Sequence, residues 1–278
     1  MHLHGGSPRV GGGLPLAGAG PSRVGGGLPL AGAACLLTGA SGGIGAATAV
    51  RLADAGALVA LHGRDRDALE RLAMRTGGVV VVADLCDPGA AETALDKAAA
   101  ALGRPLDLVV SNAGVGWYGD FVDMDPDELD RILAVNLVAP VHLARAALAG
   151  MVERGRGHLV LVGSIAGHLG VSHEAVYSAA KAGLVTLAEA LRAEVADAGV
   201  GVSLVSPSVV ATRFFERRGR PYGRRWPQPV SPELVAAAVE AAIVRGRSRV
   251  IVPAWMGAPI ALSALWPSLY RRLSYRWG

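Results

Sequence analysis

The stretch TGASGGIGAA, Thr38 to Ala47, decides the fold that the sequence predicts. It follows the apolar run AACLL at 33–37 and leads into an alanine-rich segment at 44–55, so it joins a predicted strand to a predicted helix. Its glycines let the backbone approach a ligand closely, and the amino terminus of the following helix offers unpaired N–H groups with a partial positive charge. A strand, a glycine-rich loop and a helix in this order predict a site for the pyrophosphate of a dinucleotide.

The rest of the chain repeats the same alternation of short apolar runs and longer amphipathic segments. Further runs lie at 57–61, 79–83, 106–110, 158–162, 202–205 and 250–252, and helical segments lie near 65–75, 89–102, 127–153, 173–198 and 231–245. The runs are continuous, as in strands that are buried on both faces of a parallel sheet. We therefore expect a single-domain α/β fold, a Rossmann-type doubly wound parallel sheet of about seven strands with helices on both faces. Ligands of such sheets bind at the carboxyl ends of the strands.

Composition narrows the class of protein. The 278 residues, 51% of them hydrophobic, suit one large domain. The pI near 9.4 comes from dispersed arginines, so we expect no nucleic-acid partner. Cys35 and Cys86 lack metal-ligand spacing, so we expect neither a metal site nor a disulfide, and a reducing cytoplasm fits.

The two ends of the chain differ from its middle. The segment RVGGGLPLAGA occurs at 9–19 and again at 23–33, and such glycine-rich sequence has too few large apolar side chains to fold alone. We expect a disordered tail over 1–29, with nothing before Leu28 in the fold, a catalytic domain over 30–252, and a hydrophobic extension over 253–278.

A tyrosine and a lysine stand four residues apart in AVYSAAKAG, Ala175 to Gly183. All but two of the 27 basic residues are arginine, so Lys181, like Lys97, is a rare residue type here. On a helix Tyr177 and Lys181 share one face, and the ammonium is expected to lower the pKa of the phenol. The pair is a candidate acid–base group, although a surface pair on an amphipathic helix has the same spacing.

Together these features resemble the short-chain dehydrogenase/reductase family, over about 30–252. Four segments carry the resemblance: the cofactor loop TGASGGIG (38–45), SNAG (111–114) with Ser111 in place of the first Asn of the family's N-N-A-G, GSIAG (163–167), and YSAAK (177–181) as the Y-x-x-x-K helix. The only asparagines of the chain, Asn112 and Asn136, both fall on motif positions.

The resemblance implies an oxidoreductase with Asn136, Ser164, Tyr177 and Lys181 as catalytic residues. Tyr177 is the general acid in carbonyl reduction and the base in the reverse direction, and Lys181 tunes it and binds the nicotinamide ribose. Ser164 donates a hydrogen bond to the substrate oxygen, and Asn136 holds a water in a proton relay. Each of three residues has a purely structural role as the alternative: Ser164 as a helix cap, Asn136 as a helix kink and Asn112 as a turn residue.

The second predicted strand ends in LVALHGRDRDAL, where Gly63 stands in place of the acidic residue that binds the ribose of NAD. Arg64, with Arg66 near it, predicts NADP(H), because a guanidinium binds the extra phosphate; NAD(H) is the alternative if Arg64 is only a solvated helix-start residue. Asp84 matches the adenine-contacting position, or caps the next helix. The resemblance implies cofactor contacts from Thr38, Gly39, Ser41, Gly43, Ile44, Gly45, Arg64, Asp84, Leu85, Asn112, Ala113, Gly114, Tyr177, Lys181, Pro207 and Thr212.

The substrate side departs from the family pattern. Ser208 replaces the glycine of a Pro-Gly pair, which affects the predicted loop geometry. We expect a mobile substrate loop over 213–227 and a pocket for a small hydrophobic ketone, aldehyde or secondary alcohol, shaped also by Trp117, Tyr118, His168 and His173. For 254–278 we favour an apolar arm over the pocket or a second subunit; the alternative is a segment that lies on a membrane.

Two other functions remain open: a non-catalytic dinucleotide sensor, and an NAD-linked alcohol dehydrogenase. The retained Tyr177 and Lys181 favour the enzyme. The resemblance further implies a homodimer or homotetramer packed through the helices at 127–153 and 173–198. We expect a cytoplasmic protein, with peripheral membrane association as the alternative.

Overall fold

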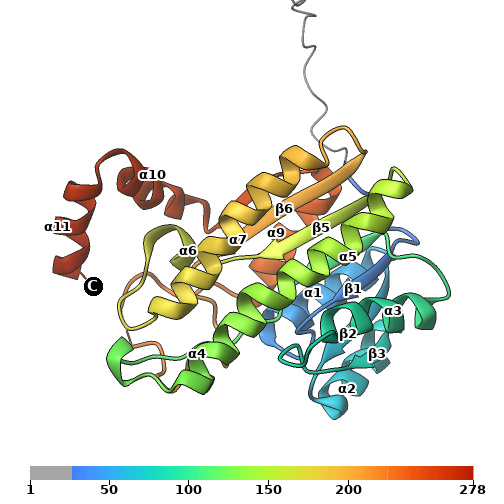
Figure 1. Cartoon of the computed structure of the whole chain (residues 1–278), viewed down its shortest axis with the longest axis horizontal. Coiled ribbons are helices and arrows are strands. Elements are labelled where there is room, and N and C mark those ends of the chain that lie inside the picture. Colours follow the sequence, from blue (N-terminus) through green and yellow to red (C-terminus); the bar gives the residue numbers. More distant parts are fainter. Residues whose placement is uncertain (1–26, 224, 278) are drawn as a thin grey trace, which may run out of the picture.

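The computed structural model describes residues 27–223 and 225–277 (Figure 1). Its seven strands form one sheet in the order β3-β2-β1-β4-β5-β6-β7, and every pair of neighbours is parallel. The strands are β1 (Ala34–Leu37), β2 (Leu58–Gly63), β3 (Val79–Val82), β4 (Leu108–Ser111), β5 (Gly157–Val162), β6 (Val200–Pro207) and β7 (Arg249–Val252). The predicted Rossmann-type doubly wound fold is thereby confirmed.

The helices lie in two layers around this sheet (Figure 1). The layers are built from α1 (Gly43–Asp54), α2 (Arg66–Thr76) and α9 (Pro232–Arg245) on one face, and from α3 (Ala90–Leu102), α4 (Pro126–Leu133), α5 (Ala139–Glu153) and α7 (Ala175–Glu194) on the other. Shorter elements are η1 (Phe121–Asp123), η2 (Ala134–Val138), α6 (Ala166–Leu169), α8 (Phe214–Arg217) and η3 (Ala254–Met256). Two helices, α10 (Gly257–Leu265) and α11 (Pro267–Trp277), complete the chain and project beyond α6 and α7.

The apolar strands are continuous because both faces of the sheet are covered. Along β1, Cys35 and Leu37 pack in a core with α1, α2 and α9, whereas Ala34 and Leu36 pack in a second core with α3, α5 and α7. Neither side of the strand meets water, so neither needs polar residues.

The fold begins before the first strand. Leu28 and Leu30 are each 5% exposed, and the Leu28 N–H donates to the Ile243 carbonyl. Part of the segment 1–29 that was expected to be a tail therefore belongs to the domain, starting at Leu28. Residues 1–26, with the first repeat copy and the first four residues of the second, lie outside the described residues.

The predicted helix at 127–153 is interrupted. Between α4 and α5 lies η2, a π-helical turn that contains Asn136. The whole span Pro126–Glu153 is long and apolar enough to cross a membrane by length and composition alone. Half of its most apolar window is buried and α5 packs against the sheet, as a core helix of this fold does.

A buried histidine gives the fold a pH dependence. His158 on β5 is 1% exposed and pairs through Nε2 with Ser203, at 2.8 Å. Burial lowers the pKa of His158 from 6.5 to about 4. Between these pH values the unfolded chain binds a proton at His158 that the folded chain does not bind. The contribution of the neutral His158 to the free energy of unfolding is therefore fully present above pH 6.5 and is lost as the pH falls toward 4.

The unfolding free energy of the wild type should decrease between pH 7.5 and pH 5.0. We expect this decrease to be smaller in His158→Gln, by on the order of 2 kcal/mol. Urea denaturation at both pH values measures this decrease for the wild type and the variant. An unchanged decrease in His158→Gln would contradict the argument.

Candidate active site

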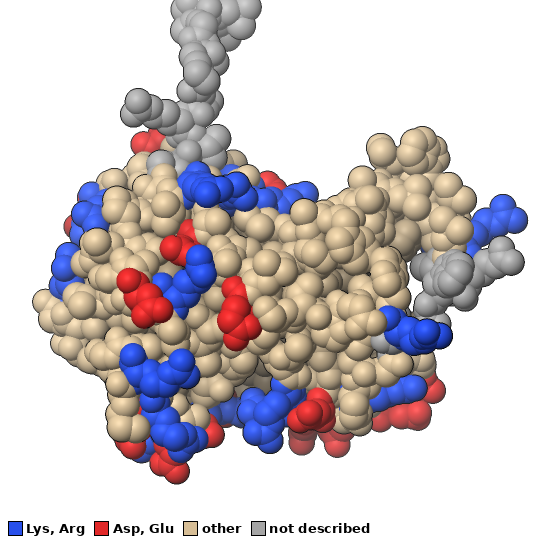
Figure 2. Space-filling view, turned by 180° about the vertical axis from the view of Figure 1, so that it is seen from behind, with Lys and Arg blue, Asp and Glu red and all other residues tan. Residues whose placement is uncertain are grey.

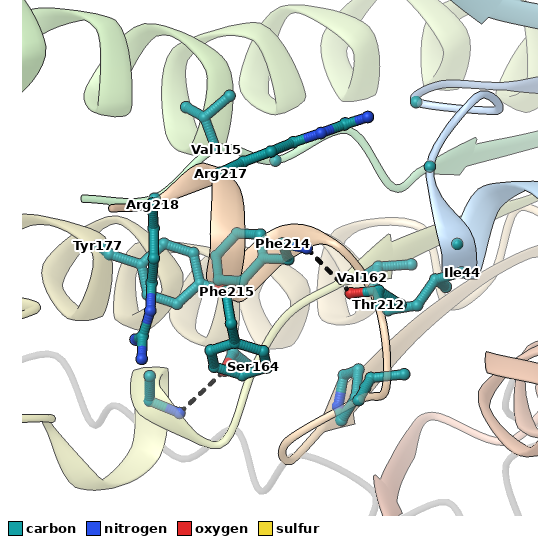
Figure 3. A pocket seen from close by; sticks show the side chains of 18 of the residues that line it. Ile44, Val115, Val162, Ser164, Tyr177, Thr212, Phe214, Phe215, Arg217 and Arg218 are labelled. Carbon is teal, nitrogen blue, oxygen red and sulfur yellow. Dashed lines mark hydrogen bonds between the residues drawn. The ribbon is translucent and has the colours of Figure 1, made fainter. Parts of the chain in front are cut away.

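A cleft of about 1820 Å³ lies at the carboxyl edge of the sheet (Figure 3). Loops that follow six of the strands meet there, as expected at the switch between β1 and β4. Of the predicted site residues only Thr38 and Asn136 do not line the cleft, and both are fully buried behind it.

The glycines of the first loop pack so closely against neighbouring residues that side chains would not fit there. Gly39 has φ +65°, and a Cβ there would lie 2.8 Å from Ala113 Cα. A Cβ on Gly43 would lie 2.5 Å from Thr212 Cγ2, and one on Gly45 would lie 2.1 Å from the Gly39 oxygen. Helix α1 has no side-chain cap and no acidic residue in its first turn. The loop thus offers bare backbone and helix N–H groups to an anionic ligand.

Thr38 and Asn112 join this loop to the one after β4. The Thr38 hydroxyl accepts hydrogen bonds from the backbone N–H groups of Asn112 (2.9 Å) and Ala113 (3.0 Å). The Asn112 side chain donates to the carbonyls of Thr38 (2.9 Å) and Gly39 (3.2 Å). Thr38 therefore holds the two loops together from behind the cleft, whereas Asn112 both holds them and lines the cleft.

Asn136 holds the next part of the same loop. Its Nδ2 donates to the carbonyls of Ile132 (3.0 Å) and Val115 (2.9 Å), and its Oδ1 accepts from the Val115 N–H (3.3 Å). A Cβ on Gly114 would lie 3.0 Å from Asn136 Oδ1 and 3.7 Å from Lys181 Nζ. The structural reading as a helix kink fits the π turn, and Gly114 lies between Asn136 and Lys181.

Tyr177 lies on α7 in the cleft, and the Ser164 hydroxyl that also lines the cleft acts to lower the pKa of its phenol. Burial raises the pKa of Tyr177 to about 12, against the opposing influences of Ser164 and Arg218. The prediction that the phenol has a lowered pKa is therefore wrong. Ser164 also accepts a hydrogen bond from Ala166 N–H at 3.1 Å, two residues on, in line with its alternative reading as a cap.

Lys181 is 3% exposed, one turn after Tyr177. Its Nζ donates to the Val162 carbonyl at 3.0 Å and lies 5.8 Å from the centre of the Tyr177 ring. Burial lowers the pKa of Lys181 to about 8. The structure thus places tyrosine, serine and lysine in one cleft. The lysine ammonium donates its hydrogen bond to a backbone carbonyl and not to the phenol.

At the end of β2, Arg64 is exposed and its Nη1 lies 3.2 Å from Asp84 Oδ2. Asp84 Oδ1 accepts from the Cys86 N–H, and helix α3 begins after Gly89, so Asp84 does not cap that helix. Burial acts to raise the pKa of Asp84, but these hydrogen bonds and the Arg64 charge outweigh it and lower the pKa.

Two further arginines lie near this end of the cleft. Arg66 pairs with Glu70 along α2, whereas Arg71, which the sequence did not single out, lines the cleft. A cleft-facing arginine within an exposed helical pattern carries no signal in the sequence alone.

The loop after β6 keeps its geometry despite Ser208. The Ser208 N–H donates to the Val252 carbonyl at 2.7 Å, and among the described non-glycine residues only His173 has a positive φ. The serine therefore meets no backbone strain where the family has glycine. Pro207 and Thr212 line the cleft, and Thr212 Oγ1 accepts from Phe214 N–H at 3.3 Å (Figure 3).

The predicted substrate loop folds back over the site. The Phe214 ring lies beside Tyr177, with centroids 5.6 Å apart (Figure 3). Arg218 forms a buried ion pair with Glu174 and lies over the Tyr118 ring, 4.9 Å from its centre. Glu174, three residues before Tyr177, was not foreseen, because its importance depends on this distant arginine.

Of the other four residues that were predicted to shape the pocket, two line the cleft and two do not. Tyr118 and His173 line the cleft. Trp117 lies over Gly119 by a small separate cavity, and the His168 Nε2 is hydrogen-bonded to Ser206 Oγ at 3.0 Å. These last two do not line the cleft, so their predicted role in shaping it is wrong.

A parallel sheet with a glycine-rich anion site at its switch point, beside a clustered tyrosine, serine and lysine, defines a nucleotide-dependent oxidoreductase. The family model for short chain dehydrogenase matches residues 33–222. The chain belongs to the short-chain dehydrogenase/reductase family and is an enzyme that acts on CH–OH or C=O groups.

Relatives and solved structures agree with this family. The chain is 32% identical over 257 residues to a bovine (Bos taurus) protein, dehydrogenase/reductase SDR family member 7B, covering 86% of this chain and 79% of the relative. It is similar to a short-chain dehydrogenase from Sphingobium yanoikuyae in complex with NADPH (28% identity, TM-score 0.72, 84% and 95% covered). It is also similar to a short-chain dehydrogenase/reductase from Burkholderia phymatum in complex with NAD (26% identity, TM-score 0.76, 85% and 94% covered).

Proposed function

We propose that this protein is an NADP(H)-dependent oxidoreductase that interconverts hydrophobic ketones or aldehydes and their alcohols. The observation that carries the proposal is the cluster of Tyr177, Ser164 and Lys181 in the same cleft as the glycine-rich loop. A sensor without catalysis would have no need of a phenol and a serine in one cleft with a buried lysine.

The residues of the cleft fit a dinucleotide. A pyrophosphate suits the first loop, because Gly39, Gly43 and Gly45 carry no side chains and the amino terminus of α1 has no side-chain cap. Leu85 and Asp84 lie where an adenine would rest, and the loop at 112–114 would border the rest of the nucleotide. When bound, the nicotinamide supplies a hydride to the substrate carbon or accepts one from it.

The chain's own groups supply the rest of the chemistry. In reduction, the Tyr177 phenol donates its proton to the substrate oxygen, and in oxidation the phenolate accepts it. Ser164 donates a hydrogen bond to the same oxygen, where negative charge develops. Lys181 carries a buried positive charge that favours phenolate, and Asn136 lies close enough to Lys181 to hold a water that returns the proton.

The substrate side of the cleft supports an apolar substrate. Phe214 and Phe215, together with Val115 and Leu169, line the part next to Tyr177. The Arg218 charge is already neutralised by Glu174. Apolar ketones are therefore the first compounds to test.

The preference for NADP(H) gives a specific prediction. Gly63 and Ser41 lie together, since a Cβ on Gly63 would lie 3.2 Å from Ser41 Oγ, and Arg64 follows directly. No carboxylate occupies the end of β2 to bind a ribose diol, so we expect Arg64→Ala to weaken NADPH binding about 10- to 100-fold and NADH binding little. Titration monitored by nicotinamide fluorescence measures both dissociation constants.

The neighbouring Arg66 provides the matched control. Its partner is Glu70 and it does not line the cleft, so Arg66→Ala should leave both dissociation constants unchanged. Tighter binding of NADH than of NADPH by the wild type would contradict the cofactor assignment and favour an NAD-linked alcohol dehydrogenase. Binding of neither nucleotide would overturn the proposed function.

We also propose that the protein assembles as a homodimer or homotetramer through α4, α5 and α7. Val138, Val141 and Val152 are exposed large apolar side chains on η2 and α5, which supports burial of this surface against a second copy. Sedimentation velocity would reveal the assembly.

A further inference from the structure

The last two helices carry an exposed apolar surface. We call α10 and α11 the C-terminal arm. Four of its large apolar side chains are exposed: Leu265 (67%), Trp266 (60%), Leu269 (48%) and Leu273 (41%). Leu269 and Leu273 are four residues apart on α11 and lie on one side of the helix, and Trp266 directly precedes that helix. No residue of α10 is buried, so the arm packs little against the domain.

The charge of this part of the chain is of one sign. There is no Asp or Glu after Glu240, whereas arginines occur at 245, 247, 249, 271, 272 and 276. Arg271 and Arg272 are exposed on α11, next to the apolar side chains. In the space-filling view the arm is largely apolar with arginine at its outer end, and no acidic side chain is visible on it (Figure 2).

The arm stands at the mouth of the cleft. Tyr270 and Arg271 on α11 and Met256 before α10 line the cleft, and burial raises the pKa of Tyr270. Exposed Trp255 stacks on exposed Trp226 of the substrate loop, with centroids 4.7 Å apart. One surface thus joins the arm to the loop that covers Tyr177.

We propose that the C-terminal arm binds the protein to an anionic lipid bilayer, with the mouth of the cleft next to the membrane. Exposed tryptophan and leucine beside arginine suit the boundary between acyl chains and anionic headgroups. Each helix is too short to span the bilayer, so the arm lies in its surface.

The charge of the C-terminal arm favours a bilayer over a second copy of the protein as the surface that the arm binds. A symmetric contact between two arms would place Arg271 and Arg272 of one copy near the same arginines of the other, with no carboxylate on either arm. An anionic headgroup surface carries charge opposite to that of these arginines. An apolar substrate dissolved in that bilayer could then enter the cleft directly.

The test is flotation of the full chain with vesicles of phosphatidylcholine alone and of phosphatidylcholine mixed with phosphatidylglycerol. We expect the wild type to float with the anionic vesicles, and less so as salt is added. Arg271→Ser/Arg272→Ser should lower the partition coefficient about 30-fold, because each arginine near an anionic surface contributes a factor of about five. Trp266→Ser/Leu269→Ser should weaken binding to both kinds of vesicle.

Helix α2 provides the matched control, because Met74 is 81% exposed beside the exposed Arg75 and lies at the opposite end of the molecule (Figure 1). Met74→Ser/Arg75→Ser should bind vesicles as the wild type does. Equal loss in this control, or no flotation of the wild type, would overturn the proposal. Arm variants that dissociate an oligomer in sedimentation but float normally would assign the arm to a second copy instead. NADPH titration is independent of these outcomes, so failure here leaves the proposed activity intact.

Discussion

Replacement of Tyr177 by phenylalanine is expected to lower kcat/KM for ketone reduction about a thousandfold, while NADPH binding changes less than about threefold. The variant keeps the ring that packs on Phe214 and removes only the hydroxyl that donates the proton. General acid catalysis by a positioned side chain contributes about 10²- to 10⁴-fold, and Tyr177 lines the cleft together with Ser164, which acts on its pKa. Steady-state kinetics with NADPH and an apolar ketone measures the loss.

The unchanged NADPH affinity is the internal control, because it shows that the variant is folded and its cleft intact. If Tyr177→Phe retained more than about a tenth of the wild-type kcat/KM, the proton would have to come from another group and the assignment would be wrong. Loss of NADPH binding together with turnover would instead show that the hydroxyl holds the cleft together.

Replacement of Lys181 by methionine is expected to reduce kcat/KM about a thousandfold and to weaken NADPH binding about 10- to 100-fold. The ammonium is buried, so removing it takes away both a charge beside the phenol and a donor to the nucleotide. Methionine has similar length and suits the apolar surroundings that lower the pKa of Lys181 to about 8. We therefore expect the folded state to persist in this variant.

The only other lysine of the chain supplies the control. Lys97 is exposed on α3, and Lys97→Met should leave turnover and NADPH binding unchanged. A pH series adds a second readout: wild-type affinity for NADPH should fall as the pH rises through about 8, where Lys181 loses its proton, and Lys181→Met should lack this step. Wild-type affinity that is constant from pH 7 to about 9.5 would contradict the role of the ammonium.

The sequence predicts the parts of the molecule that depend on local pattern. The strands are apolar because both faces are covered, so their runs are visible without tertiary information. The glycine loop is visible for the same reason, since a Cβ on Gly45 would collide with the Gly39 backbone. Both features follow from constraints within one strand, loop and helix.

The parts that were not predicted depend on distant contacts. The direction of the Tyr177 pKa shift is set by burial, to which the Phe214 ring contributes, and the fold of that loop cannot be inferred from spacing along α7. The ion pair between Glu174 and Arg218 joins residues 44 positions apart. The π turn depends on the Asn136 amide, which binds the loop after β4.

That π turn has a consequence for protein engineering. A π-helical turn contains one residue more than the α-helical turn it replaces, so the stretch Ala134–Val138 sets the rotation of α5 relative to α4. Deleting a single residue there would allow a regular helix to form, and the apolar composition of the segment would hardly change. The carboxamide of Asn136 would nevertheless turn away from Val115 and Lys181. Length at this point of the chain is therefore as much a part of the active site as any side chain.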